Sequence, residues 1–249
     1  MPSIIVKGNY QDKAIRFLPP NTTNLLYWGM YGKDVAFTAK NHKDGSEVAT
    51  IGTPIYPNTN YATFKGGTNY LKTPVLQTPS LTLIAVFKID SEVAFNLLSV
   101  FNGTGQGGSP SLVRGAGLEL RVGTASDGKL DLVANRSVNV NGTDTVSPAT
   151  MAAGYNAGEW CAVAMTVNNA TGLCKVYNLT KNTVGTNSNT KPVSLNTVGF
   201  TIGSQITMPT TNEGNVAMAA IYSDSKTDAE INDIYVKMKQ YYAKRGITI

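Results

Sequence analysis

The sequence predicts an all-β fold of stacked antiparallel sheets, closed by one amphipathic helix near the C-terminal end. Residues 161–167 are apolar or small at both alternating positions, which is the pattern of a strand covered on both faces. Charged residues make up only 15% of the chain, and turn-forming polar residues crowd the segments between apolar runs. After residue 226 the hydrophobic period changes from 2 to 3.6. A buried central strand requires two packed layers.

The central element is a predicted antiparallel hairpin over residues 158–178. Its turn, residues 168–172, has five turn-forming residues that include a glycine. In this hairpin Cys161 and Cys174 are several residues out of register. A disulfide needs Cα atoms within about 7 Å, so we expect two buried free thiols.

The chain before the sandwich, residues 1–22, contains two short β-prone runs at residues 3–6 and 14–18. We expect this segment to be either an edge strand or an arm that docks on another subunit or particle. Residues 23–249 are predicted to form one sandwich domain that includes a helix over residues 227–245.

The strands of the sandwich are predicted from short alternating apolar runs. None of the early runs has a helical period. The expected strands and runs are residues 25–28, 35–38, 48–51, 61–64, 69–71, 80–89, 95–101, 117–122, 129–134, 200–203 and 215–222. Residues 135–157 are expected to be long, polar and irregular, as functional loops often are.

The C-terminal helix is predicted from its ends and its apolar stripe. Thr227 and Glu230 have the spacing of a capping box, and Gly246 follows the last basic residues. We expect the stripe to pack on the sandwich, with a partner-binding surface as the alternative. The stripe consists of Ile231, Ile234, Tyr235, Met238, Tyr241 and Tyr242.

Charge and hydropathy exclude several function classes. The net charge of +5 is modest and spread along the chain, without a basic stripe interleaved with aromatics, so no nucleic-acid partner is expected. No run of 18 apolar residues is present, so no membrane insertion is expected. Residues 1–20 carry four charges and predict no signal peptide, so we expect synthesis in the cytoplasm.

The sequence offers little catalytic chemistry. Retaining glycoside hydrolysis needs two closely spaced carboxylates, and no Glu-x-Asp-x-Glu spacing occurs in the chain. Glu119 is expected to be the single acid of its strand, and Asp131 is expected to be a solvated residue of the next strand. His42 is expected in an exposed turn. It is the single histidine of the chain, and one histidine is too few for a histidine zinc site. Residues 103–108 match GxGxxG but lead into a strand where phosphate binding needs a helix.

Exposed aromatics and loop amides are the residue types that would bind a glycan. The candidates are Tyr70, Asn102, Gln106, Asn141 and Tyr155, whereas Trp160 is assigned to the core because it starts a buried strand. We expect no cofactor and no metal. The candidates for a calcium ion held by loop oxygens are Asp127 and Asp144, with Asn141 and Asn212 as further oxygen donors.

Several segments, in this order, resemble the concanavalin A-like, laminin-G-type jelly roll over about residues 23–243. The matching pieces are residues 64–71, 80–88, 158–166, 171–177, 202–203 and 215–231. The helix end at residues 243–247 looks like versions found in bacteriophage virion proteins. The resemblance implies a two-sheet jelly-roll sandwich of twelve to fourteen strands. It implies a protein that binds carbohydrate, binds protein or serves as scaffold.

Three hypotheses follow. The first is a non-enzymatic bacteriophage virion structural protein, tail or fibre associated, that adheres to host-surface glycan. The second is a capsid or tail decoration protein whose sandwich contacts other virion proteins. Either would be made in the host cytoplasm, end in the virion and form a homo-oligomer on the particle. The third, a polysaccharide-degrading enzyme, is disfavoured by the missing carboxylate pair.

Overall fold

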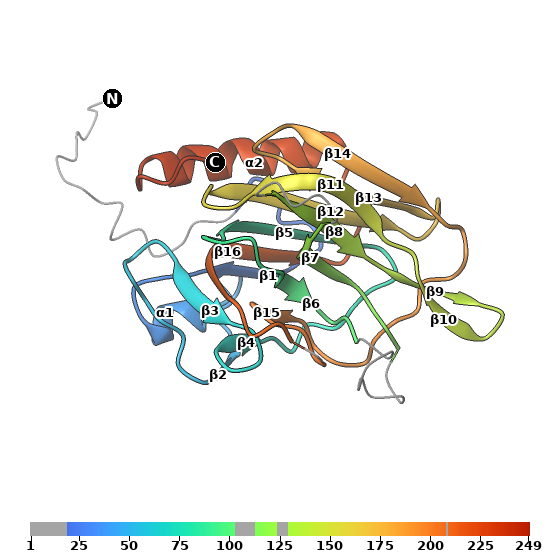
Figure 1. The fold of residues 1–249 in the computed structure, drawn as a ribbon, viewed down its shortest axis with the longest axis horizontal. Coiled ribbons are helices and arrows are strands. Elements are labelled where there is room, and N and C mark those ends of the chain that lie inside the picture. Colours follow the sequence, from blue (N-terminus) through green and yellow to red (C-terminus); the bar gives the residue numbers. More distant parts are fainter. Residues whose placement is uncertain (1–18, 103–112, 124–128, 208) are drawn as a thin grey trace, which may run out of the picture.

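The computed structural model describes residues 19–102, 113–123, 129–207 and 209–249. Within these residues the chain forms two seven-stranded sheets stacked face to face, with one long helix along the outside (Figure 1). All strand pairs are antiparallel in this described part. The predicted all-β, two-sheet jelly-roll sandwich is confirmed. The runs at residues 3–6 and 14–18 lie outside the described residues.

The first sheet has the order β1-β16-β5-β12-β13-β14, and β3 also pairs with β16. Its strands are β1 (Leu25–Met30), β3 (Ala62–Lys65), β5 (Leu81–Lys88), β12 (Cys161–Asn168), β13 (Leu173–Asn178), β14 (Thr183–Ser188) and β16 (Glu213–Tyr222). The second sheet has the order β11-β8-β7-β6-β15-β4-β2. Its strands are β2 (Ala49–Ile51), β4 (Tyr70–Lys72), β6 (Phe95–Ser99), β7 (Gly117–Val122), β8 (Lys129–Asn135), β11 (Ala149–Asn156) and β15 (Thr201–Ile202).

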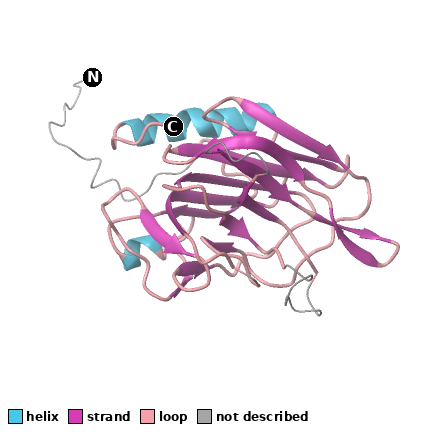
Figure 2. Cartoon of the chain, viewed as in Figure 1, coloured by secondary structure: helices cyan, strands magenta, loops and turns pink. Residues whose placement is uncertain are grey.

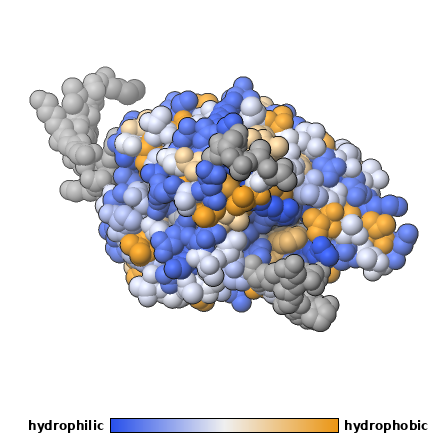
Figure 3. All heavy atoms as spheres, in the orientation of Figure 1, coloured by the Kyte–Doolittle hydropathy of each residue, from blue (hydrophilic) through white to orange (hydrophobic). Residues whose placement is uncertain are grey.

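The remaining elements are a separate hairpin and two helices. They are β9 (Ser137–Val140), β10 (Thr143–Val146), α1 (Val35–Thr38) and α2 (Asp228–Ala243). Figure 2 shows how strands dominate the molecule, with the single long helix lying over one side. In the described residues no helix has the length and apolar character needed to span a membrane. Hydrophilic and hydrophobic residues are interspersed over the face drawn in Figure 3.

The predicted central hairpin is confirmed. Strand β12 lies between β5 and β13, with Val163 opposite both Ala85 and Asn178. Cys161 and Cys174 are buried free thiols, as expected. Burial raises the pKa of Cys161 to about 12 and that of Cys174 to about 11.

Two hydrophobic clusters lie on opposite faces of the first sheet. One fills the space between the sheets and includes Phe87 and Leu118. The other lies under α2, where Ile234 and Met238 pack on the outer side chains of the sheet. The capping box of Thr227 and Glu230 forms as predicted. The predicted stripe therefore packs on the sandwich, with four of its residues buried and both Tyr235 and Tyr241 partly buried.

Three expectations about local structure are wrong. Residues 35–38 form the short helix α1, because the side chain of Asp34 caps Phe37 N. Residues 135–157 are not irregular: they hold β9 and β10, which pair with each other, and β11, which pairs with β8. Their polar exposed faces hide the strand signal. His42 is buried, with its ring 4.6 Å from that of Phe37 and its Nε2 3.2 Å from Phe37 O.

Candidate functional site

A row of polar side chains crosses three neighbouring strands on the outer face of the first sheet. We call it the outer strip; its members are Thr63, Lys65, Lys88, Asp90, Glu213 and Asn215. Asn215 is opposite Lys88 on one side and Thr63 on the other, and Glu213 is opposite Lys65. The alternating neighbours Phe64, Phe87 and Val216 fill the core between the sheets, so the strip faces outward.

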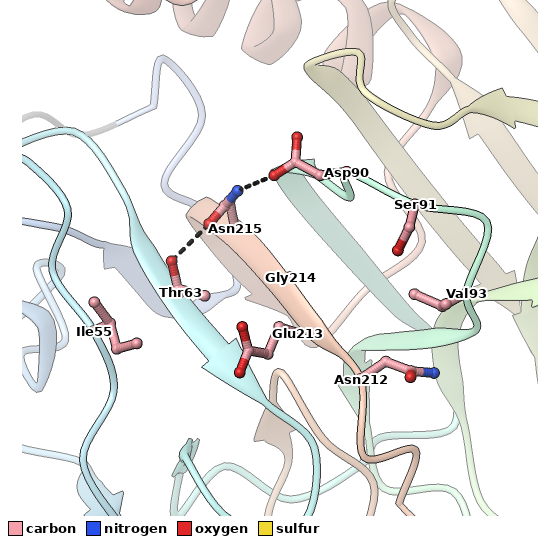
Figure 4. A pocket seen from close by; sticks show the side chains of 9 residues that line it. All are labelled: Ile55, Thr63, Asp90, Ser91, Val93, Asn212, Glu213, Gly214 and Asn215. Carbon is pink, nitrogen blue, oxygen red and sulfur yellow. Dashed lines mark hydrogen bonds between the residues drawn. The ribbon is translucent and has the colours of Figure 1, made fainter.

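Hydrogen bonds link the strip across the strands (Figure 4). Thr63 Oγ1 donates to Asn215 Oδ1 at 2.6 Å, and Asn215 Nδ2 donates to Asp90 Oδ2 at 3.0 Å. Lys88 Nζ lies 2.8 Å from the other oxygen of Asp90. Asn215 therefore has a fixed orientation, with its oxygen toward β3 and its nitrogen toward the end of β5.

An open pocket of about 430 Å³ adjoins the strip (Figure 4). It is lined by Ile55, Thr63, Asp90, Ser91, Val93, Asn212, Glu213, Gly214 and Asn215. Gly214 faces inward, where an added Cβ would lie 2.5 Å from Ile89 Cδ1 and 2.7 Å from Phe95 Cζ. This close packing allows only glycine between the two outward-facing polar residues of β16.

Charge in the strip is balanced. Each of its two carboxylates has a lysine beside it, with Lys65 Nζ 3.5 Å from Glu213 Oε1 and Lys88 beside Asp90. The exposed surface consists of hydroxyl, amide, carboxylate and ammonium groups without net charge. Such a surface can exchange hydrogen bonds with a ligand that has many hydroxyl groups.

A second hollow of about 330 Å³ lies between β13, β14 and α2. It is lined by Tyr177, Asn178, Leu179, Asn182, Thr183, Val184, Asp228, Ile231, Asn232 and Tyr235. Lys175 Nζ donates to Asp228 at 2.8 Å, and Tyr177 OH donates to the same carboxylate at 2.7 Å. These bonds lower the pKa of Asp228 from its ordinary value. The same bonds hold the first residue of α2, Asp228, against β13.

The structure separates the glycan candidates rather than collecting them. Tyr70 is partly buried on β4 in the second sheet. Asn141 is exposed at the turn between β9 and β10, with φ of 53°. Gln106 lies outside the described residues.

The exposure expected for two glycan candidates, Asn102 and Tyr155, is wrong. Asn102 is fully buried, and its Oδ1 accepts a hydrogen bond from Thr207 Oγ1 at 2.6 Å. Tyr155 is 1% exposed on β11; its hydroxyl accepts from Ile89 N and donates toward the carbonyl oxygens of Ile89 and Glu159. The long segment expected to be a loop is a strand there, so the tyrosine faces the core.

Metal candidates are likewise dispersed. Asp144 accepts a hydrogen bond from the backbone N of Arg114, and Asn212 Nδ2 donates to Ala94 O at 3.0 Å. Asp127 lies outside the described residues. Over residues 19–102, 113–123, 129–207 and 209–249, no three His, Cys, Asp or Glu side chains gather as a metal site would require.

The acids considered for catalysis have structural partners. Glu119 is buried between Arg121, at 2.5 Å, and Asn96, at 2.8 Å. Asp131 accepts a hydrogen bond from Ala153 N at 3.0 Å.

Sequence reasoning missed the six residues of the outer strip and one aromatic pair. Trp160 precedes β12 and packs against the hydrophobic cluster under α2, so its predicted core role holds in part, but it is only partly buried. Its ring centroid lies 5.2 Å from that of Tyr61 in an edge-to-face arrangement. The alternation of side chains along β12 could have placed Trp160 correctly. Trp160 alternates with Ala162 and Ala164, which face α2, so it belongs to the outer face.

No protein-family model and no curated protein matches the chain. Solved structures do. The receptor-binding domain of botulinum neurotoxin C/D mosaic serotype has a TM-score of 0.59 at 12% identity, over 87% of this chain and 52% of that chain. The botulinum neurotoxin serotype D ligand-binding domain in complex with N-acetylneuraminic acid has a TM-score of 0.57 at 12% identity, over 86% and 51%.

A third structure, the binding domain of botulinum neurotoxin DC in complex with SialylT, has a TM-score of 0.58 at 11% identity, over 88% of this chain and 52% of that chain. The chain spans about half the length of these structures. At such identity the likeness shows the fold alone, which is a lectin-like β-sandwich.

Proposed function

We propose that this chain is a non-enzymatic bacteriophage virion structural protein, associated with the tail or a tail fibre, whose sandwich adheres to host-surface glycan. The observation that carries the proposal is the outer strip, where Thr63, Asn215 and Asp90 form a hydrogen-bonded row beside an open polar pocket. Fixed polar groups that converge on a pocket are what ligand orientation requires.

Other features support parts of this proposal. Two buried free cysteines suit folding in a reducing cytoplasm before release in a particle. The resemblance of residues 243–247 to virion proteins favours a phage origin, and the neutral, hydroxyl-rich strip favours a carbohydrate. Virion proteins form repeated arrays, and a homo-oligomer on the particle would multiply weak glycan contacts.

The experiment is a glycan array and a host-cell binding assay with the purified chain. We expect Asn215→Ala to abolish binding, because it removes both hydrogen bonds that align the strip. Asn232→Ala is the matched control, since Asn232 is an exposed amide in the hollow beside α2. Absence of binding by the unaltered protein to every glycan and to host cells would overturn the adhesion proposal.

A decoration role is the second candidate. It is favoured by β14, which forms one edge of the first sheet and carries Val184 with 53% exposure. In this case the partners are other virion proteins, and residues 1–22 would be the attachment arm. Deletion of residues 1–22 should then abolish incorporation into particles, while incorporation at the normal level would contradict the arm. Release of reducing sugar from host polysaccharide would instead support an enzyme.

A further inference from the structure

An aromatic pair borders the outer strip. Tyr61 immediately precedes β3, two residues before Thr63, and packs on the outer face of the sheet like Thr63. Trp160 immediately precedes Cys161, whose partner on β5 is Phe87. Trp160 therefore stands next to Lys88 at the same end of the sheet. Both aromatic side chains pack against the hydrophobic cluster under α2 and are partly buried, so each keeps some surface exposed to solvent.

The separation of the rings shows how they lie. Their strands, β3 and β12, are separated in the sheet by β16 and β5. Three strand spacings amount to about 14 Å, yet the ring centroids are only 5.2 Å apart. Both side chains must therefore extend over the sheet toward each other, alongside the row of Thr63, Asn215 and Lys88.

Helix α2 ends beside this pair. Asn60 Nδ2 donates to Arg245 O at 3.2 Å, directly before Tyr61 and just after the helix. The rings thus stand between the end of α2 and the outer strip. The result is a shelf with a polar floor across three strands, β3, β16 and β5, and one aromatic wall.

We infer that Tyr61 and Trp160 form the stacking wall of an extended oligosaccharide site, and that the ligand is a linear neutral glycan of several sugar units. This inference rests on the proposed glycan function and deepens it. The polar row from Thr63 to Lys88 crosses two strand spacings, about 10 Å, which exceeds one sugar ring, so a monosaccharide cannot contact both ends of the row. Apolar sugar faces pack against the rings while hydroxyl groups bond to the strip. The paired lysines and carboxylates provide no net charge to select an acidic sugar.

The two tryptophans of the chain make the site measurable. Trp28 is 0% exposed and packed under α2, whereas Trp160 is only partly buried. Acrylamide quenching of fluorescence will therefore report mainly on Trp160. The probes are maltohexaose, cellohexaose and chitohexaose, with glucose and N-acetylglucosamine as single-unit comparisons. We expect at least one hexasaccharide to protect Trp160 from quenching and to bind at least ten times more tightly than its monosaccharide.

Variants separate stacking from folding. Tyr61→Leu should weaken hexasaccharide binding about two- to tenfold, whereas Tyr61→Phe keeps the ring and should bind like the unaltered protein. Trp160→Phe should remove the protection signal, and urea unfolding will show whether each variant is folded. Trp160→Leu provides the corresponding loss of the second ring.

The possible failures differ. If the glycan array or host cells bind the protein but no hexasaccharide protects Trp160, or if Tyr61→Leu binds normally, the aromatic wall is wrong and the proposed function stands. Equal affinity for hexasaccharide and monosaccharide also overturns the extended site. If nothing binds on the array, to cells or in the quenching assay, both proposals fail together.

Discussion

The outer strip can be tested without a ligand by placing a carboxylate at its centre. In Asn215→Asp the new side chain can still accept the hydrogen bond from Thr63 Oγ1, but it cannot donate to Asp90. The lost hydrogen bond is worth about 1 kcal/mol. Two carboxylates roughly 4 Å apart repel by about 1 kcal/mol in water-like surroundings. This value applies to Asp90 because its side chain is 62% exposed to solvent. We expect a loss of about 2 kcal/mol in the free energy of unfolding at pH 7.

The repulsive part depends on pH with a definite sign. The neighbouring carboxylate raises the pKa of the introduced carboxyl group in the folded state above its unfolded value. The folded variant therefore binds a proton more readily, and its destabilisation shrinks as pH falls through the raised pKa. Urea unfolding at pH 7 and at about pH 3, below the unfolded pKa, should show the deficit falling from about 2 to about 1 kcal/mol.

The matched control is Asn168→Asp. Asn168 accepts hydrogen bonds from Ala170 N and Thr171 N through Oδ1, and an aspartate can accept both. It should change stability by less than about 0.5 kcal/mol. An Asn215→Asp deficit that equals this control, or that is the same at both pH values, would refute the hydrogen-bonded strip.

Three further predictions concern the scaffold. Ile234→Ala, at a fully buried position of α2, should lower the free energy of unfolding in urea by about 2–5 kcal/mol. Val236→Ala, at a 41% exposed position of the same helix, should lower it by about 0.5 kcal/mol or less. Similar losses for the two variants would show that α2 does not pack as described. The folded protein should resist Ellman's reagent at neutral pH, because both thiols are buried and their pKa values are raised. In urea it should yield two reactive thiols, and fast labelling of the folded state would contradict the burial of the thiols. Hydrogen bonds from Lys175 and then Tyr177 lower the pKa of Asp228, so its contribution is present above the ordinary carboxyl pKa and is lost as pH falls through the lowered value. Asp228→Asn should therefore flatten the acid side of the stability profile below about pH 4, and an unchanged slope would count against this bond network.

The parts of the fold that the sequence predicted are those with strong local patterns. Strand β12 is apolar on both faces because it has the inter-sheet core on one side and α2 on the other. The start of α2 follows from a capping box that lies within four residues. Both features are visible in a short window of sequence. The predicted pairing of β12 with β13 and the predicted packing of α2 on the sandwich are both correct.

The polar strands could not be predicted in the same way. β14 has no fully buried residue and β10 has none either, so neither carries a hydrophobic alternation. Their backbone hydrogen bonds to β13 and β9 make them strands. Each pairs with the strand directly before it in the chain, so the signal lies in the turns, where Asn141, Gly142 and Asn182 have positive φ, and not in the strands themselves.

The candidate site was missed for a related reason. Its residues come from three distant parts of the chain, near residues 63, 88 and 215, and only the strand register places them together. The loop-based candidates included Tyr155, whose alternation with Met151 is interrupted by a register shift that hides its inward direction. The sequence identified suitable residue types but had no means of choosing the correct face.

The most direct test of glycan binding on the outer face is a crystal structure of the protein soaked with the best-binding hexasaccharide. We predict sugar density along Thr63, Asn215 and Lys88, with at least one ring against Tyr61 or Trp160. Density confined to the hollow beside α2 or to the β9–β10 turn, or no bound sugar at saturating concentration, would contradict the account.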